Sequence, residues 1–419
     1  LYDRRDLLVE KLSSIIDITT DGRDPDEFVI HTAGNVLVQG RIGRQFDLVS
    51  GIDTEGFSHV VWKESGEEAH FSSGSLKALI EMRDVTLRGE IQNLDSMTMN
   101  FIDLVNEAHR AGYGTNGKTG LDFFTEHPFV TNVAGNYDRN GDGVYDSTYI
   151  FRVTGQNKLD SRAQIGLEGT INLSGQNGLV QVPYYATDTV ADVVKRINNS
   201  GAEVVARLDR EGRLTLKGTP AADPANPDFV IRHVEDSGRF LEGYAGLLQD
   251  RGADGAFRWD QADAALNLQG EAADYAVAPI AHPSGWIEVN PALVKEPASI
   301  ASGYGENGKP ANPGNGEAAL AIASIRNSEV MVGKLGTFDD YFADAVARVG
   351  LMGEQSDRAL ETQNLIMKQL KDMRDSISGV NIDEELSQMI KYQHGYAAAA
   401  RFISTVNEML DTIINRMGV

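Results

Sequence analysis

A short polar stretch places oxygen-bearing side chains at the spacing of a calcium-binding loop. The four candidate ligands stand at positions 1, 3, 5 and 9 of such a loop: Asp138, Asn140, Asp142 and Asp146. Gly143 falls at position 6, where the chain must turn sharply, but position 12 is Tyr149 and not the usual bidentate glutamate. The spacing predicts a weak calcium site as the one optional cofactor. The alternative interpretation is a polar turn whose side chains bond to the backbone.

Residues Gly112 to Thr119 match the phosphate-binding pattern GxxxxGK[ST]. That chemistry needs a strand before the loop and a helix after it, so that backbone amides converge on the phosphate. Here apolar periodicity predicts a helix before the loop, and Gly120 and Pro128 follow it. We therefore expect a glycine-rich turn and no nucleotide site.

Catalytic patterns of the common kinds are missing from the sequence. It contains no cysteine, which excludes disulfides, thiolate metal sites and thiol nucleophiles. It contains neither HExxH nor GxSxG, so a zinc protease or an esterase of the familiar types is unsupported. We expect no enzymatic activity.

The net charge and the hydropathy of the chain limit the kinds of partner that it could bind. The chain has 38 basic and 61 acidic residues and a formal net charge of −23. Such a chain would be repelled by nucleic acid phosphates and anionic membrane surfaces. It also lacks an apolar run of about 18 residues that could cross a bilayer. We therefore expect neither nucleic acid binding nor membrane insertion.

Hydrophobic periodicity predicts an α+β fold of several domains, elongated and rich in long helices. Residues 1–20 and 74–110 carry apolar side chains at helical spacing, and residues 28–49 alternate as a β-hairpin. From about residue 126 the apolar runs shorten and Gly, Asn and Asp become frequent, which indicates β structure. Within it, Thr189 is expected to start a short helix, followed by a hairpin that ends near Leu216.

The last part of the chain carries a sustained heptad, which buries itself against another helix in proteins of known structure. Its apolar residues, which we expect at a subunit interface, are Ile382, Met389, Tyr392, Tyr396, Ala399, Ile403, Val406, Leu410, Ile413 and Met417. A second heptad runs from Phe338 to Ile377. The alternative for both is the core of an ordinary helical bundle.

Several segments resemble a known family. The stretch from Ser378 to Glu385, with Tyr392-Gln393 and residues 397–401 and 407–410, resembles the C-terminal motif of flagellar rod, hook and hook-associated proteins. Further segments narrow the resemblance to the first hook-associated protein family, that of the hook–filament junction: residues 3–8, 34–40, 73–79, Arg83-Asp84 and 122–124. The unit from Thr187 to Leu216 resembles a small repeat of flagellins and hook-associated proteins.

This resemblance implies a structural subunit of the bacterial flagellum that connects hook and filament by helix packing. It implies type III export with a flagellar chaperone, an extracellular location, and assembly as a ring of identical subunits between hook protein and a second junction protein. The C-terminal helix would pair with an N-terminal helix of its own chain. We expect the sequence to be a fragment that lacks this N-terminal segment.

Three domains are expected. Residues 1–125 plus 286–376 would form a discontinuous helical axial domain with a β-hairpin, residues 126–285 a β-rich outer domain, and residues 377–419 a terminal coiled-coil-type helix. Two alternatives remain open from the sequence. One is another flagellar axial protein, either a hook or a flagellin-like subunit. The other is an extracellular adhesin or calcium-binding surface module.

Overall fold

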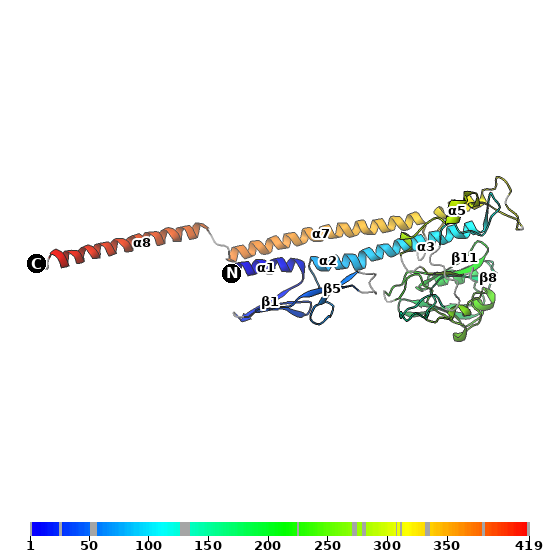
Figure 1. Cartoon of the computed structure of the whole chain (residues 1–419), viewed down its shortest axis with the longest axis horizontal. Helices are drawn as coiled ribbons and strands as arrows, with labels where there is room; N and C mark the ends of the chain where they lie inside the picture. Colours follow the sequence, from blue (N-terminus) through cyan, green and yellow to red (C-terminus); the bar gives the residue numbers. More distant parts are fainter. Residues whose placement is uncertain are drawn as a thin grey trace. The chain divides into compact units, whose positions relative to one another are not determined.

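The computed structural model describes residues 2–24, 27–50, 57–125, 135–223, 226–269, 275–278, 282–306, 308–310, 312–331, 336–378 and 382–416. The chain divides into two compact units, Leu1–Ala345 and Val346–Val419. The mixture of long helices with several antiparallel sheets confirms the α+β prediction (Figure 1). The finer division into three domains stays a prediction.

The N-terminal part of the first unit joins a helix to two small antiparallel sheets. Its elements are α1 (Tyr2–Ile15), β1 (Thr19–Asp24), β2 (Glu27–Thr32), β3 (Asn35–Gln39), β4 (Ile42–Gly43), β5 (Phe46–Ser50) and β6 (Ser58–Trp62). Strands β2 and β3 form the predicted hairpin, with Ala33 and Gly34 both at positive φ in its turn. Ile16, Ile30, Trp62 and neighbouring apolar residues form the core under these sheets.

A long helical run follows, as the periodicity predicts. It consists of α2 (Ser75–Glu81), a π-helical segment (Met82–Leu87) and α3 (Arg88–Arg110). The π-helical segment holds Arg83, whose guanidinium donates to the carbonyl of Ser58 at 2.9 Å and to Asp84 at 2.6 Å. The wider turn therefore coincides with the point where the helix is fastened to strand β6.

The segment between residues 135 and 278 is built from two four-stranded sheets. Its elements are β8 (Ile150–Lys158), β9 (Gly169–Gly175), β10 (Gly178–Tyr184), α4 (Val190–Asn198), β11 (Val204–Leu208), β12 (Arg213–Gly218), β13 (His233–Asp236), β14 (Phe257–Arg258) and β15 (Tyr275–Val277). The strand orders are β10-β9-β13-β14 and β11-β12-β8-β15. The predicted helix and hairpin near Leu216 are α4, β11 and β12.

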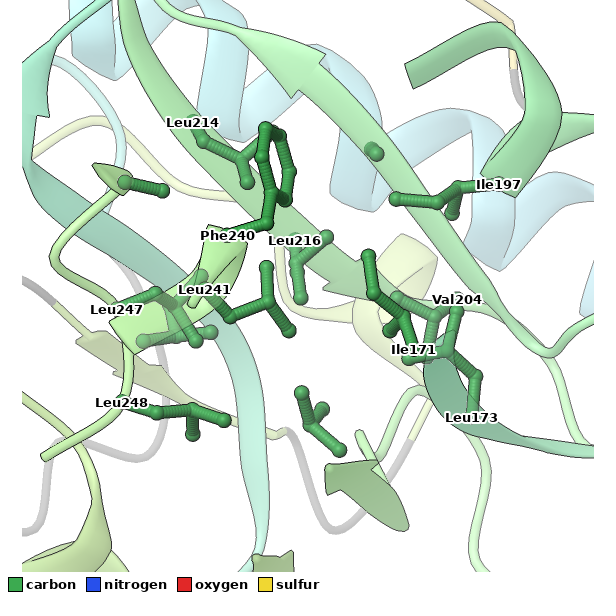
Figure 2. Packing of buried hydrophobic residues seen from close by; sticks show 14 of the residues in the cluster. Ile171, Leu173, Ile197, Val204, Leu214, Leu216, Phe240, Leu241, Leu247 and Leu248 are labelled. Carbon is green, nitrogen blue, oxygen red and sulfur yellow. The ribbon is translucent and has the colours of Figure 1, made fainter. Parts of the chain in front are cut away.

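The start of α4 shows why this helix was predictable. Thr189 accepts a hydrogen bond from the backbone N–H of Asp192 at 3.2 Å, and the Asp192 carboxylate accepts from the N–H of Thr189 at 2.9 Å. This reciprocal capping box satisfies two N–H groups that the first helical turn leaves open. The apolar face of α4 then enters the main core, where Ile197 lies among Leu173, Val204 and Leu216 (Figure 2).

The chain returns from the β-rich segment to the end of α3 and continues as helices. The remaining elements are β7 (Gly112–Gly114), α5 (Pro291–Lys295), β16 (Ala301–Tyr304), α6 (Glu317–Ser324), α7 (Phe338–Ser378) and α8 (Ile382–Asp411). Strands β7 and β16 pair with each other. The ring of Phe101 packs against those of Phe124 and Phe338. Within the described ranges, no helix combines the length and the apolar character that crossing a membrane requires.

Candidate assembly interface

Helix α8 carries the predicted seam as an exposed stripe. None of its described residues is buried. The large seam side chains of α8 have high exposed fractions, namely Ile382 77%, Met389 49%, Tyr392 73%, Tyr396 80%, Ile403 60% and Leu410 47%. The seam continues into the π-helical segment Thr412–Arg416, where Ile413 is 58% exposed. Ala399 is exposed, Val406 is half-buried, and Met417 lies outside the described residues. Within the unit Val346–Val419, the described residues therefore leave this stripe uncovered.

The stripe is continuous along the helix axis. The seam has two apolar positions in each heptad, which places one apolar layer about every 5 Å, and the 30 residues of α8 span about 45 Å. Each exposed Leu, Ile or Met side chain gains roughly 1.5–3 kcal/mol when it is fully buried. Seven large side chains in one row are enough to drive a helix–helix contact once a partner is present.

Acidic residues gather where α8 begins. Asp383, Glu384 and Glu385 occupy its first turn, next to the positive end of the helix dipole. Their charge stabilises the start of a helix that tertiary packing does not support. The predicted N-cap Asn381 lies outside the described residues.

Helix α7 presents a second apolar row over most of its 41 residues. Its start is fixed, because the Thr337 hydroxyl and N–H bond to the Asp340 carboxylate, and Tyr341 donates to Asn93 at 3.0 Å. Beyond residue 345 the large apolar side chains of this heptad are exposed, including Val349 50%, Ile366 43%, Leu370 54% and Met373 59%. Within the unit Val346–Val419, the described residues leave this second heptad uncovered, like that of α8.

The calcium-like loop is closed by its own backbone. The Asp138 carboxylate accepts from the N–H groups of Gly141 and Gly143, both at 2.7 Å. The Asp142 carboxylate accepts from the N–H of Val144 at 2.8 Å, and that of Asp146 from the N–H of Arg139 at 3.0 Å. Asn140 accepts from the N–H of Asp142 at 3.0 Å.

These bonds fit the polar turn that was the alternative interpretation. In the described ranges, no three His, Asp or Glu residues lie close enough to hold a metal ion together. Tyr149, at position 12, is buried and stacks on the ring of Tyr137 at 4.2 Å between centroids. Calcium binding stays a prediction.

The phosphate-like motif is a turn, as its context predicts. Helix α3 precedes it, strand β7 forms its first three residues, and backbone amides of the motif bond within the chain. The N–H of Gly114 donates to the carbonyl of Lys118 at 2.8 Å, and that of Asn116 to the carbonyl of Ala298 at 3.3 Å. The Lys118 ammonium lies 2.5 Å from the Glu296 carboxylate. The donors that would cradle a phosphate are thus already used.

The spacing of apolar residues did not predict the buried polar side chains of helix α3. Helix α3 buries a row of polar side chains, Asp95, Asn100, Asp103, Asn106 and His109. Several of them bond to residues more than 100 positions away, such as Asp103 to Lys217 and Asp95 to His282. The only signal in the sequence is that these residues recur on one helical face.

Three family models match parts of the chain. Residues 1–124 match the helical domain of flagellar hook-associated protein FlgK, and residues 170–219 match the flagellin hook IN motif. Residues 374–417 match the C-terminal segment of the flagellar basal body rod FlgEFG proteins, which includes all the seam residues named above. These are the segments in which the sequence showed its resemblance.

Curated relatives match along almost the whole chain. Flagellar hook-associated protein 1 of Escherichia coli (strain K12) is 26% identical over 423 residues, which cover 99% of this chain and 64% of the relative. The protein of the same name from Salmonella typhimurium is 26% identical over 426 residues, with the same shares. That of Bacillus subtilis is 31% identical over 102 residues, 24% of this chain and 20% of the relative. The chain thus spans 64% of the length of the first two relatives.

Among solved structures, the flagellar hook junction protein FlgK from Burkholderia pseudomallei aligns with a TM-score of 0.43 and 14% identity, over 90% of this chain and 78% of that one. The sequence matches identify the chain more specifically than this structural alignment does. Residues 1–124 match the FlgK helical domain, and the hook-associated relative from E. coli matches 99% of the chain. By these matches the chain is similar to flagellar hook-associated protein 1 along almost its whole length.

Proposed function

We propose that this chain is a structural subunit of the bacterial flagellum that joins hook and filament through helix packing between subunits, without catalysis. The observation that carries the proposal is the exposed apolar stripe that runs along α8 from Ile382 and continues to Ile413, in a chain similar to flagellar hook-associated protein 1. A stripe of this length is costly to leave in water. In a protein that assembles with copies of itself, a neighbouring subunit would cover this stripe.

The energetics favour a partner helix over a flat surface. Heptad spacing matches the supercoil of two packed helices, in which each apolar side chain enters a gap between four residues of the partner. The formal charge of −23 opposes association of free subunits at low salt. Assembly would therefore depend on burial of the stripe and on screening of charge.

The partners follow from the family and belong to the proposal. They are an N-terminal helix of the same protein, identical subunits in a ring, hook protein on one side and a second junction protein on the other. A flagellar export chaperone would hold the subunit before secretion, and the final location would be extracellular, in the flagellum.

Electron microscopy of flagella tests the proposal. A strain without this protein should make hooks but no attached filaments, and the unaltered gene should restore the filaments. Ile403→Asp places a charge in the α8 stripe and should fail to restore them. Thr405→Asp is the matched control, because Thr405 is an exposed β-branched residue outside the heptad positions of the stripe. Normal filaments with Ile403→Asp, secreted at the usual level, would refute the proposal.

A further inference from the structure

The sulfur atoms of this chain all belong to methionines, because the sequence has ten methionines and no cysteine. Peroxides oxidise proteins at the sulfur atoms of thiolates and thioethers. Here only thioethers are available to such an oxidant. Six of the methionines fall within the unit Val346–Val419, namely Met352, Met367, Met373, Met389, Met409 and Met417.

Three described methionines occupy heptad positions of the two apolar rows and are exposed. Met352 (38%) and Met373 (59%) belong to the row of α7, and Met389 (49%) belongs to the stripe of α8. Met331 has the opposite environment, since it is 5% exposed and its sulfur accepts a hydrogen bond from the Asn100 amide at 3.8 Å. An oxidant in the solvent can therefore reach the three heptad methionines but not Met331.

Met389 also lies in the part of α8 that is best shaped to receive another helix. Ile382 and Tyr396 occupy the same heptad position, one heptad before and one heptad after it. Together with Leu386 and Tyr392, these three side chains line a shallow and mainly apolar groove on α8. A chemical change at the Met389 sulfur therefore alters the surface on which helix packing depends.

We propose that Met352, Met373 and Met389 are sites of reversible oxidation to methionine sulfoxide by oxidants of the peroxide class, and that the sulfoxide opposes assembly. The effect on assembly rests on the proposed function. In the reaction, a lone pair of the thioether sulfur attacks one peroxide oxygen, the O–O bond breaks and an S–O bond forms. Sulfur loses two electrons, and the second oxygen leaves as water after it takes up the proton of the transferred hydroxyl.

The product places a polar group where the heptad requires an apolar one. A partner helix with an apolar face would bury the sulfoxide oxygen without a hydrogen-bond donor, which weakens association by about tenfold for each such site. Methionine sulfoxide reductases convert the sulfoxide back to the thioether, so the modification is reversible. Oxidised subunits would then be withheld from assembly until they are reduced.

Mass spectrometry of the folded full chain after treatment with dilute hydrogen peroxide tests the sites. Met352, Met373 and Met389 should be oxidised about tenfold faster than Met331, because oxidation follows exposure of the sulfur. In concentrated urea the four rates should converge, which is the control for local sequence effects. Oxidation of the heptad methionines as slow as that of Met331 in the folded chain would overturn the assignment, whether or not the chain assembles.

Filament formation tests the consequence for assembly. Met389→Gln introduces a polar side chain of similar length in place of the sulfoxide, and it should lower the number of filaments per cell about tenfold. Met389→Leu keeps an apolar side chain of similar volume and should preserve the filaments. Met367→Gln is the matched control, because Met367 is 47% exposed but lies outside the heptad positions of α7.

Equal filament numbers with Met389→Gln and Met367→Gln, at equal secretion, would overturn the link between oxidation and assembly. The variant Ile403→Asp separates this failure from a failure of the proposed function. If Ile403→Asp still abolishes the filaments, helix packing by α8 stands and only the role of the sulfoxide is refuted. If Ile403→Asp forms filaments as well, the proposed function is refuted together with the inference.

Discussion

Asp103 of α3 and Lys217 of β12 form an ion pair in which each side chain is 4% exposed. The Lys217 ammonium also donates to the amide oxygen of Asn100, one turn earlier on α3, at 3.2 Å. At the end of the helix, Glu107 accepts from the backbone N–H of Arg210 at 2.9 Å. One face of α3 thus holds the β-rich segment by polar contacts, in addition to the apolar packing of Met99 against residues such as Tyr149.

Removing the charge of Asp103 should destabilise the chain strongly. Asp103→Asn leaves Lys217, Arg152 and Arg207 without the carboxylate that they share. Loss of one partner from a buried ion pair costs about 3–5 kcal/mol, because the remaining charge stays buried. Urea unfolding followed by circular dichroism should show a lower midpoint, which corresponds to a loss of that size in the free energy of unfolding.

Asp339→Asn is the control for this experiment. Asp339 pairs with Arg326 at 3.0 Å, but the two side chains are 65% and 74% exposed. Exposed pairs of this kind contribute about 0–1 kcal/mol. If both substitutions shift the urea midpoint equally, the buried cluster around Asp103 stabilises the fold no more than an exposed ion pair does.

The stability of the first unit should fall when the pH drops below about 6.5, the ordinary pKa of histidine. His109 is buried, its Nδ1 lies 2.6 Å from the carbonyl of Leu121, and its Nε2 accepts from the N–H of Ala301 at 3.0 Å. The acceptor role of Nε2 requires a neutral ring, and burial lowers the pKa of His109 below 6.5. Below pH 6.5 the unfolded chain therefore binds more protons than the folded chain, so acid favours unfolding.

Unfolding midpoints at pH 7.5 and 5.5 measure this effect. His109→Gln should lower the midpoint at pH 7.5 and reduce its dependence on pH, because the titrating group is gone. His70→Gln replaces an exposed imidazole and should leave the slope unchanged. A pH dependence that survives in His109→Gln would show that other groups cause it.

Helix α8 should exchange its amide hydrogens faster than α3 in the isolated subunit. Helices that bury no side chains open at low free energy, and none of the described residues of α8 is buried. Hydrogen exchange with mass spectrometry should show α8 peptides protected only after assembly into flagella. Strong protection of α8 in a verified monomer would mean that the chain itself covers the stripe.

The elements that the sequence predicted are those governed by local patterns. The capping box at Thr189, the apolar face of α4 that contains Val193 and Ile197, and the hairpin turn at Gly34 each depend on residues a few positions apart. The α8 seam was predictable for the same reason, since heptad spacing is a property of one helix. The exposure of that seam required the structure.

The polar contacts of α3 were not predictable in this way. Asp103 and Lys217 are separated by more than 100 positions, and neither belongs to a motif with a known partner. The π-helical segment Met82–Leu87 was not predictable either, because its residues have the pattern of an ordinary α-helix. Such features depend on which helices and strands contact each other in the fold. The spacing of apolar residues along the chain gives no information about those contacts.

Weak calcium binding by the loop from Asp138 to Asp146 is the last prediction. If the loop binds calcium, its carboxylates must exchange their bonds to the backbone N–H groups of Gly141 and Gly143 for bonds to the metal, or share them. We expect a dissociation constant of about 10⁻⁴–10⁻³ M, because the glutamate at position 12 is replaced by Tyr149. Calorimetry should give a small heat of binding that Asp142→Ala abolishes. Asp160→Ala, which alters a carboxylate in a different turn, should bind calcium normally. Equal heats from Asp142→Ala and the unaltered chain would leave the loop as a polar turn, stabilised by hydrogen bonds alone.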